Sequence, residues 1–409
     1  MLLALALLLP PLALAAYWSV ALAQILRTFR DVPTARDGAR LARTSPPTAR
    51  VAIIVPAHNE RAVIARLIAS IRAQTHADLH AILVLDRCTD DTAAVARDAI
   101  AGDPRFTILE NGSCPDGWAG KVHAAHLGRA EAARIITRDG RPFDFLLFTD
   151  ADNEFDPELL AATLALARER RLALLSLLST PARTHWFEKI AQPWAGLELM
   201  RQYPLRRANL PDNPRAFANG QYMLFRADRY DTLGGHEAVR EALLEDLALA
   251  RRFAEHKEPV GAFLSAGMLR VAMYDAWPAF QSGWKRIYIE SARRKPARLR
   301  RAALHTLAAG VLLPVAGLAC AILLTLLPPT EAAAALRTSA RVLAWLAFVP
   351  WLACATIVVR QSRLPAPWAL AHPIGAWLVA RILARAARDL RRRVPIRWAG
   401  KDYVLEPRD

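Results

Sequence analysis

The sequence predicts an α/β protein with a doubly wound, mixed but mainly parallel sheet, helices on both sheet faces, and α-helical transmembrane segments at both ends. Between residues 51 and 150, short apolar runs alternate with segments of helical periodicity, which is the element order of a doubly wound sheet. The flanking stretches 1–26 and 302–327 carry no charged side chain. Each is long enough to cross a bilayer core of about 30 Å.

Four apolar runs have the length of buried strands, because strands covered on both faces are apolar throughout rather than alternating. They cover residues 51–60, 80–86, 105–110 and 143–150. Helical periodicity predicts helices over residues 61–74, 89–100 and 120–136. The polar motifs "PAHNE", "DRCTDD" and "TDAD" all follow predicted strands. In such sheets ligands lie beyond the carboxyl ends of the strands, so we expect these motifs to line one crevice.

The chain divides into five regions by composition. We expect residues 1–26 to be an uncleaved anchor, because no basic residue precedes the apolar run and the run continues to Leu26. Hydrophobicity returns at 302–327 and 342–359, and more weakly at 364–384, which contains two early prolines and Arg381. The predicted regions are the anchor 1–26, a linker 27–50, an α/β domain 51–290, a C-terminal transmembrane region 302–384 and a basic tail 385–409.

The positive charge indicates a membrane rather than a nucleic acid as partner. The net charge is +16, and arginine-rich runs at 292–301 and 385–393 border the hydrophobic segments. This is the positive-inside pattern. It predicts a multi-pass protein of the cell membrane, with residues 27–300 and the tail on the cytoplasmic face. One span before the domain and three after it cannot satisfy that pattern, so we expect one segment not to cross.

Asp150 and Asp152 follow a predicted buried strand in "FLLFTDADNEF". Two carboxylates so close repel each other and lose hydration when buried. Such a pair suits a hard divalent cation, Mg²⁺ or Mn²⁺, which also takes phosphate oxygens as ligands. Asp-x-Asp is also common in polar loops, and the position after a buried strand favours the metal interpretation.

A second acidic pair, Glu245 and Asp246, begins a predicted helix in "LLEDLALARRF". Acids in a first helical turn are stabilised by the helix dipole, which is the structural explanation. A functional role for the pair is the alternative.

Taken in order, these motifs resemble those of membrane-anchored family 2 glycosyltransferases with a GT-A fold, over roughly residues 50–290. Hopanoid-associated and ceramide-glucosyltransferase-like members show the most similar pattern, with carotenoid glycosyltransferases nearby. The segments that carry this pattern are "DGWAGKVHAAHLG" and "RRANLPDNPRAFANGQYMLFRAD". The second nucleotide motif of the family often has two adjacent acids, whereas here Leu85 precedes Asp86.

The resemblance implies roles for individual residues. Asp246, with Glu245 beside it, matches the catalytic base, and Asp150 and Asp152 match the metal-binding pair. The residues implied in nucleotide binding are Pro56, Ala57, Glu60, Asp86, Lys121 and Asp150.

The implied reaction is metal-dependent transfer of one sugar from a nucleotide-sugar, expected to be a UDP-sugar, to the hydroxyl of a membrane lipid of hopanoid, sphingolipid or carotenoid type. One base without a nucleophilic carboxylate implies single displacement and inversion. Processive members carry Q-x-x-R-W, whereas "QSGWKRIYIE" has Gln281, Trp284 and Arg286 in another order. A processive polysaccharide synthase therefore stays an alternative, as does a non-catalytic membrane scaffold with this fold.

Aromatic and basic residues interleave between residues 276 and 300. They predict an interfacial helix at the lipid headgroups, with ordinary core packing of the aromatics as the alternative. A nucleotidyltransferase would need a glycine-rich turn after the first strand, which "PAHNERA" lacks. No protein partner can be inferred.

Overall fold

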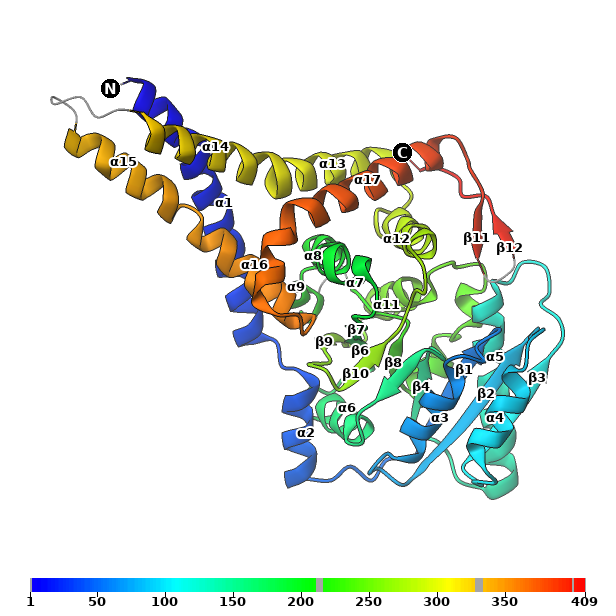
Figure 1. Cartoon of the computed structure of the whole chain (residues 1–409). Helices are drawn as coiled ribbons and strands as arrows, with labels where there is room; N and C mark the ends of the chain where they lie inside the picture. The colour runs from blue at the N-terminus through cyan, green and yellow to red at the C-terminus, as the bar shows by residue number, and fades with distance from the viewer. Residues whose placement is uncertain (1, 211–215, 328–333, 399–400, 409) are drawn as a thin grey trace.

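The computed structural model describes residues 2–210, 216–327, 334–398 and 401–408. Residues 211–215 of the predicted α/β domain and 399–400 of the predicted tail lie outside the described part. Its centre is a seven-stranded sheet of order β3-β2-β1-β4-β8-β6-β9 (Figure 1). The strands are β1 (Val51–Ala57), β2 (Leu79–Asp86), β3 (Phe106–Asn111), β4 (Phe145–Thr149), β6 (Leu174–Leu178), β8 (Tyr222–Arg226) and β9 (Val260–Leu264).

The predicted mixed, mainly parallel sheet is confirmed. β1, β2, β3 and β4 pair in parallel, as do β6 and β9, whereas β8 runs antiparallel to both β4 and β6. The four strands expected before residue 150 are all present.

Helices cover both faces of the sheet (Figure 1). Successive side chains of β1 point to opposite faces, and both Ile53 and Ile54 are fully buried in separate apolar clusters. This explains the uninterrupted apolar run. One face packs α2 (Ala35–Thr44), α3 (Ile64–Arg72), α4 (Thr92–Ile100) and α6 (Leu159–Glu169), and the other packs α5 (Gly120–Asp139), α10 (Ala227–Thr232) and α11 (Glu245–Glu255).

A small sheet of β5 (Asn153–Phe155), β10 (Leu269–Val271) and β7 (Thr180–Pro181) continues the chain directly after β4. β5 pairs antiparallel with β10. The Asp-x-Asp motif therefore occupies the connection between two strands that belong to different sheets, which fixes both ends of that short turn.

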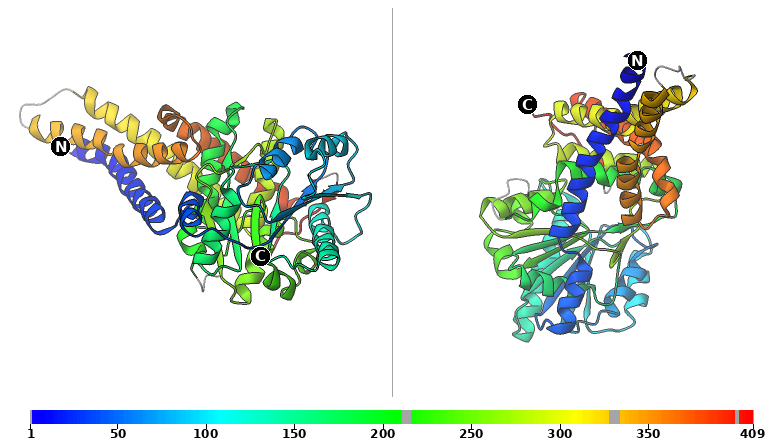
Figure 2. Two further views of the ribbon diagram at one scale, coloured as in Figure 1. Left: turned by 90° about the horizontal axis from the view of Figure 1, so that it is seen from below. Right: turned by 90° about the vertical axis from the view of Figure 1, so that its left-hand side faces the viewer.

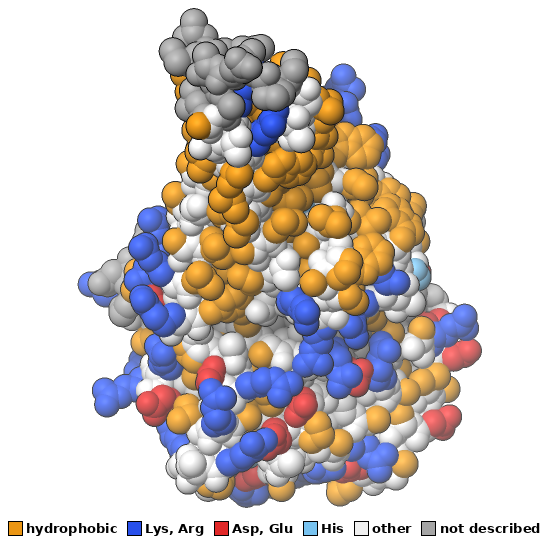
Figure 3. All heavy atoms as spheres, turned by 60° about the vertical axis from the view of Figure 1, so that its left-hand side comes forward, with side chains coloured by type: hydrophobic (Ala, Val, Ile, Leu, Met, Phe, Trp, Pro, Cys, Tyr) orange, Lys and Arg blue, Asp and Glu red, His pale blue; other side chains and the backbone are white. Residues whose placement is uncertain are grey.

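The terminal helices form an arm that projects from the domain (Figures 1 and 2). Within the described residues, three helices are long and apolar enough to cross a membrane: Leu5–Asp31, Pro296–Leu326 and Arg337–Gln361. Hydrophobic side chains cover the face of the arm seen in Figure 3, and Lys and Arg side chains gather at its base. The elements are α1 (Leu2–Asp31), α13 (Pro296–Leu307), the π-helical turn η2 (Ala308–Leu312), α14 (Leu313–Leu326), α15 (Ala334–Leu346), α16 (Val349–Gln361), the 3-10 helix η4 (Ala366–Ala371) and α17 (His372–Arg391).

The expected boundaries need corrections. Residues 27–50 are not an open linker, because α2 buries Ala35, Gly38, Ala39 and Ala42 against the domain. Residues 364–384 fall in η4 and α17 and are not among the three membrane-length helices of the described part. The basic tail includes the end of α17 and a hairpin of β11 (Ile396–Trp398) and β12 (Lys401–Tyr403).

The helix expected at the headgroup layer is α12 (Trp277–Ser291), which lies in the protein interior. Trp284 and Tyr288 are buried in a cluster with residues of α17. Core packing is therefore the better account of these aromatics. The remaining elements of this part are α7 (Trp186–Ile190), α8 (Gln192–Gln202), α9 (Leu205–Ala208) and the 3-10 helix η1 (Glu237–Val239).

Candidate active site

Lys121 lies at the centre of the acidic crevice. It is the second residue of α5, and its Nζ lies 2.7 Å from Asp150 Oδ1 and 2.7 Å from Glu245 Oε1. Burial lowers the pKa of Lys121, but the two carboxylates outweigh that effect and raise the pKa above its ordinary value. One ammonium group thus holds together α5, the turn after β4 and the start of α11.

The second acidic pair has two different environments. Burial raises the pKa of Glu245, but Lys121 outweighs it and the net shift is downward. Asp246 Oδ2 accepts a hydrogen bond from the Gly220 amide at 2.9 Å, and Oδ1 accepts one from the Leu247 amide at 2.7 Å. Burial and the charge of Glu245 raise the pKa of Asp246 to about 6. Asp246 is therefore the acid of the pair that can exchange a proton near neutral pH.

Gly220 permits this close arrangement. A Cβ atom added at this position would lie 3.0 Å from Glu245 Oε1, 3.0 Å from Lys121 Nζ and 3.4 Å from Asp246 Oδ2. A side chain would make all three charged groups move by a few tenths of an ångström, so glycine suits the "NG" turn before β8.

Asp152 is the carboxylate that fits a bound cation. Its Oδ1 is buried and has no hydrogen-bond partner among the described residues. Burial, together with the charges of Asp150 and Glu60, raises the pKa of Asp152 well above its ordinary value. Burial and the charge of Asp150 likewise raise the pKa of Glu60 to about 7. A divalent cation between Asp150 and Asp152 would remove this repulsion, and carboxylate oxygens are the ligands that Mg²⁺ and Mn²⁺ prefer.

The described residues contain no group of three or more His, Cys, Asp and Glu side chains placed to hold a metal. The two aspartates alone would leave most coordination positions to water or to a ligand's phosphate oxygens. Mg²⁺ is commonly bound in this way, through one or two carboxylates plus substrate phosphates.

Asp86 occupies a separate part of the crevice and has partners that the sequence did not reveal. Arg87 donates to Asp86 Oδ2 from Nη2 at 2.7 Å and from Nε at 3.0 Å, and Asn111 Nδ2 donates to Oδ1 at 2.7 Å. A Cβ atom at Gly120 would lie 2.5 Å from Arg87 Nη2. The start of α5 therefore lies beside the Asp86–Arg87 pair and connects it to Lys121.

The remaining predicted nucleotide residues lie at the same edge of the sheet. Pro56 and Ala57 end β1, and Ala57 is 3% exposed. The Glu60 amide donates to Thr92 Oγ1 at 2.8 Å, which ties the "PAHNE" turn to the start of α4. The structure thus brings the predicted site residues to one edge of the sheet, in two connected parts.

Arg286 of α12 is the basic residue near this site whose role sequence reasoning missed. It is 8% exposed, and its Nη1 donates to the Leu243 carbonyl at 3.1 Å. Burial lowers the pKa of Arg286, while the charges of Tyr274, Glu245 and Asp246 oppose that shift. The sequence did contain a signal for this role: Arg286 shares one helical face with aromatic residues. If that face is buried, the charge of the arginine needs acidic partners.

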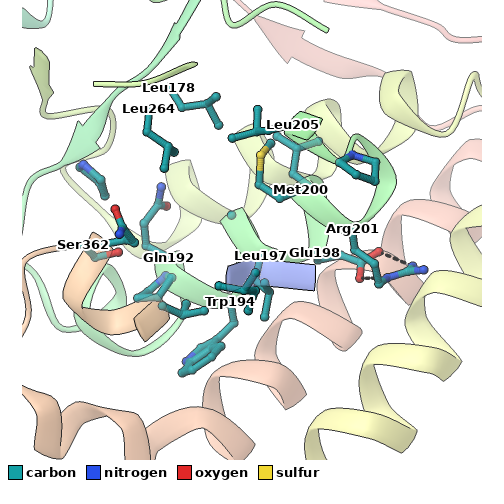
Figure 4. A pocket seen from close by; sticks show the side chains of 18 of the residues that line it. Leu178, Gln192, Trp194, Leu197, Glu198, Met200, Arg201, Leu205, Leu264 and Ser362 are labelled. Atoms are coloured by element: carbon teal, nitrogen blue, oxygen red, sulfur yellow. Dashed lines mark hydrogen bonds and ion pairs between the residues drawn. The ribbon is translucent and has the colours of Figure 1, made fainter. Parts of the chain in front are cut away.

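A cavity of about 460 Å³ extends from Asp246 to the terminal helices. Asp246, Asn219 and Gln221 line its domain side. The opposite walls come from α1, α8, η2, α16 and α17, and include Tyr17, Ile25, Trp194, Leu197, Ala309 and Val358. Figure 4 shows the largely apolar wall formed by Leu178, Leu264, Met200 and Leu205. Asp246 therefore belongs to both the charged crevice and this cavity.

The chain belongs to the family described as "Glycosyltransferase like family 2", whose model matches residues 46–279. Among curated relatives, a 4,4'-diaponeurosporenoate glycosyltransferase of Staphylococcus haemolyticus is 24% identical over 253 residues, covering 61% of this chain and 64% of the relative. The Staphylococcus aureus protein of the same name is 28% identical over 240 residues, covering 57% and 59%. These matches span less than two thirds of the relatives' own lengths.

Solved structures with a similar arrangement include a mannosyltransferase of Pyrobaculum calidifontis in complex with GDP-Man and Mn²⁺. It is 16% identical and covers 94% of this chain and 99% of its own, with a TM-score of 0.44. A second is residues 1–349 of S. aureus TarS, which is 13% identical and covers 87% and 96%, with a TM-score of 0.39.

The double ion pair of Lys121 predicts a pH-dependent loss of stability in Lys121→Ala. Removing one partner of a fully buried pair costs about 3–5 kcal/mol, and we expect about 2–3 kcal/mol here because the lysine is one quarter exposed. The loss should shrink as the pH falls, because in the variant burial without the ammonium group raises the pKa of Asp150 and Glu245, and protonation then removes their unpaired charges. Urea unfolding at pH 7 and pH 4.5 measures this difference. Exposed Lys257→Ala is the control, and equal losses in the two variants would contradict the prediction.

Proposed function

We propose that this chain is an inverting, metal-dependent glycosyltransferase that moves one sugar from a nucleotide-sugar to the hydroxyl of a membrane lipid. The observation that carries the proposal is the position of Asp246, which lies in the acidic crevice and also lines the cavity that reaches the membrane-length helices. A base in this position could meet a water-borne donor from one side and a lipid acceptor from the other.

The donor side follows from the charges of the crevice. Asp150 and Asp152 would hold Mg²⁺ or Mn²⁺, which when bound would neutralise a nucleoside diphosphate. Lys121 and Arg286 add positive charge beside the acids, and such charge stabilises a departing diphosphate. Asp86, Glu60, Pro56 and Ala57 lie where the nucleoside would bind, at the carboxyl ends of the parallel strands.

The chemical step assigns the proton to Asp246. The acceptor oxygen forms a bond to the anomeric carbon as its proton passes to an Asp246 carboxylate oxygen. The bond between that carbon and the diphosphate breaks, and its electron pair leaves with the diphosphate. Glu245 is engaged by Lys121, so Asp246 acts alone, and a single displacement inverts the anomeric configuration by the logic of inverting hydrolases.

The acceptor is proposed from the cavity walls. The walls are mainly apolar and include residues of the three membrane-length helices Leu5–Asp31, Pro296–Leu326 and Arg337–Gln361. Apolar walls bind apolar chains by the hydrophobic effect. The relatives named for diaponeurosporenoate support an extended apolar acceptor. Hopanoid, sphingolipid and carotenoid acceptors all meet this description, and a UDP-sugar is the proposed donor.

The proposed topology has three crossings. Leu5–Asp31, Pro296–Leu326 and Arg337–Gln361 would each cross once, which leaves the catalytic domain and the tail on the same side. The arginine runs at 292–301 and 385–393 favour the cytoplasm for that side. α17 would stay at this face without crossing.

Calorimetric titration of the detergent-purified full chain with UDP, with and without Mn²⁺, tests the donor site. We expect binding that requires Mn²⁺ and is lost in Asp152→Ala, because the cation loses a ligand. Asp98→Ala, an exposed acid of α4, is the matched control and should bind as the wild type does. If UDP, GDP and dTDP all fail to bind folded protein with Mn²⁺ or Mg²⁺, the proposal is wrong and a non-catalytic scaffold is the better account.

The pKa of Asp246 predicts the pH dependence of transfer. Its carboxyl must be ionised to accept a proton, so the rate should rise with pH and reach half of its maximum near pH 6, because burial and the charge of Glu245 raise its pKa to about 6. Glu245→Gln should move that midpoint to lower pH, because it removes a neighbouring negative charge. Initial rates between pH 4.5 and 8 check both statements. A midpoint that does not move in Glu245→Gln would count against Asp246 as the base.

Gly196 offers a test of the acceptor cavity. It lines the cavity, and a Cβ atom added there would meet no heavy atom within 4 Å. We expect Gly196→Phe to lower transfer to lipid at least about tenfold by occupying space, while the affinity for UDP stays unchanged. Gly196→Ala is the matched control and should retain transfer. Equal activity of the Phe and Ala variants would show that the acceptor binds elsewhere.

A further inference from the structure

A cluster of polar side chains lies on the cavity wall formed by the terminal helices and α8. Arg201 donates to Glu198 from Nε at 2.8 Å and from Nη2 at 2.8 Å, and Thr306 Oγ1 donates to Glu198 Oε2 at 3.2 Å. Tyr17 OH and His305 Nε2 share a hydrogen bond of 3.0 Å. All five residues line the cavity, and Figure 4 shows the Arg201–Glu198 pair apart from Leu178 and Leu264.

Glu198 has a complete set of partners within the protein. It is 5% exposed, and besides Arg201 and Thr306 it accepts a hydrogen bond from Gln202 Nε2 at 3.1 Å. These bonds connect α8 with α13. A structural role in joining the two helices therefore accounts for Glu198 and Thr306.

That structural role leaves two observations unexplained. The Arg201 side chain is 40% exposed although it borders a mainly apolar cavity, and Glu198 engages only two of its three guanidinium nitrogens. Tyr17 and His305 form a second polar pair on the same wall, between α1 and α13. Polar groups beside an apolar cavity cost free energy unless they find hydrogen-bond partners. A ligand oxygen would supply such a partner.

We propose that this cluster, defined by Tyr17, Glu198, Arg201, His305 and Thr306, binds a second, uncharged oxygen-bearing group of the acceptor. The inference rests on the proposed function, in which the reacting hydroxyl lies near Asp246. The acceptor is then an amphiphile with polar groups at two points and an apolar stretch between them. A lipid with a single hydroxyl would fill the cavity but leave the cluster unpaired.

The charge balance of the cluster selects an uncharged group. Glu198 already neutralises Arg201 through two hydrogen bonds, so an acidic group would bring a second negative charge to one guanidinium in a mainly apolar cavity. A hydroxyl, amide or carbonyl oxygen needs only donors. Arg201 can provide one through its third guanidinium nitrogen, and Tyr17 can provide one through its hydroxyl when His305 Nε2 donates to it, without a change of net charge.

Competitive binding tests this inference without any sugar donor. The detergent-purified full chain is incubated with equimolar mixtures of a long-chain α,ω-diol and the mono-alcohol of the same length, over a series of chain lengths, and the retained lipids are counted by native mass spectrometry. We expect the wild type to retain the diol over the alcohol at least about fivefold at one length. Arg201→Lys, which keeps a charge beside Glu198 but loses the planar fork, should bring that ratio close to one.

Tyr17→Phe provides a second variant that keeps the ring and removes one hydroxyl, and it should reduce the preference in part. Arg206→Lys is the matched control, because Arg206 pairs with Asp31 and is not among the residues lining the cavity. A wild-type ratio equal to that of Arg201→Lys at every length would overturn the inference. If the wild type prefers the diol but transfers no sugar to it, the result would count against the proposed function and not against this inference. The failure of the inference and the failure of the proposed function are therefore distinguishable.

Discussion

The pairing of Lys121 with Asp150 and Glu245 is the constraint on which the rest of the site depends. Asp150, Asp152, Glu245 and Asp246 gather in this crevice. Burial and neighbouring carboxylates raise the pKa of each except Glu245, whose pKa Lys121 lowers. The lysine pairs with Asp150 and Glu245. In our proposal Asp150 and Asp152 would hold a divalent cation, and Asp246 would accept a proton. One ion-pair arrangement therefore divides chemically similar acids into different roles, and it does so by joining α5, the turn after β4 and the start of α11.

The cavity connects Asp246 with the membrane-length helices. Asp246 faces a space enclosed in part by membrane-length helices, so the reacting centre lies between the aqueous crevice and the membrane side of the molecule. In the proposed reaction a lipid would present its hydroxyl without leaving an apolar environment, while the nucleotide would stay with the charged groups. The polar cluster around Arg201 adds a second point of recognition, and two points fix the orientation of a long molecule better than one.

Much of the fold was predictable because its signals are local. Continuous apolar runs gave the strands from β1 to β4, and the polar motifs that follow β1, β2 and β4 indicated the crevice. The acidic start of α11 was also visible in "LLEDL". The order of β8, β6 and β9 was not, because it depends on pairing between distant residues such as Leu146 and Phe225.

Other features depended on contacts that no short segment contains. Arg87 was not recognised as the partner of Asp86. Arg286 was interpreted as an interfacial residue, because the burial of α12 against α17 is a property of the whole fold. The cavity likewise combines residues from α1, α8, η2 and α16, which lie far apart in the sequence. Long-range packing, rather than local propensity, decided these features.

The most direct test of the central claim is to measure both UDP binding and sugar transfer into extractable lipid for Asp246→Asn. Asparagine keeps the shape of the side chain but cannot accept the proton. Our account predicts that Mn²⁺-dependent UDP affinity stays within about twofold of the wild type, while transfer falls by about 10²–10⁴-fold, the range typical of a lost general base. Undiminished transfer by this variant would contradict the account.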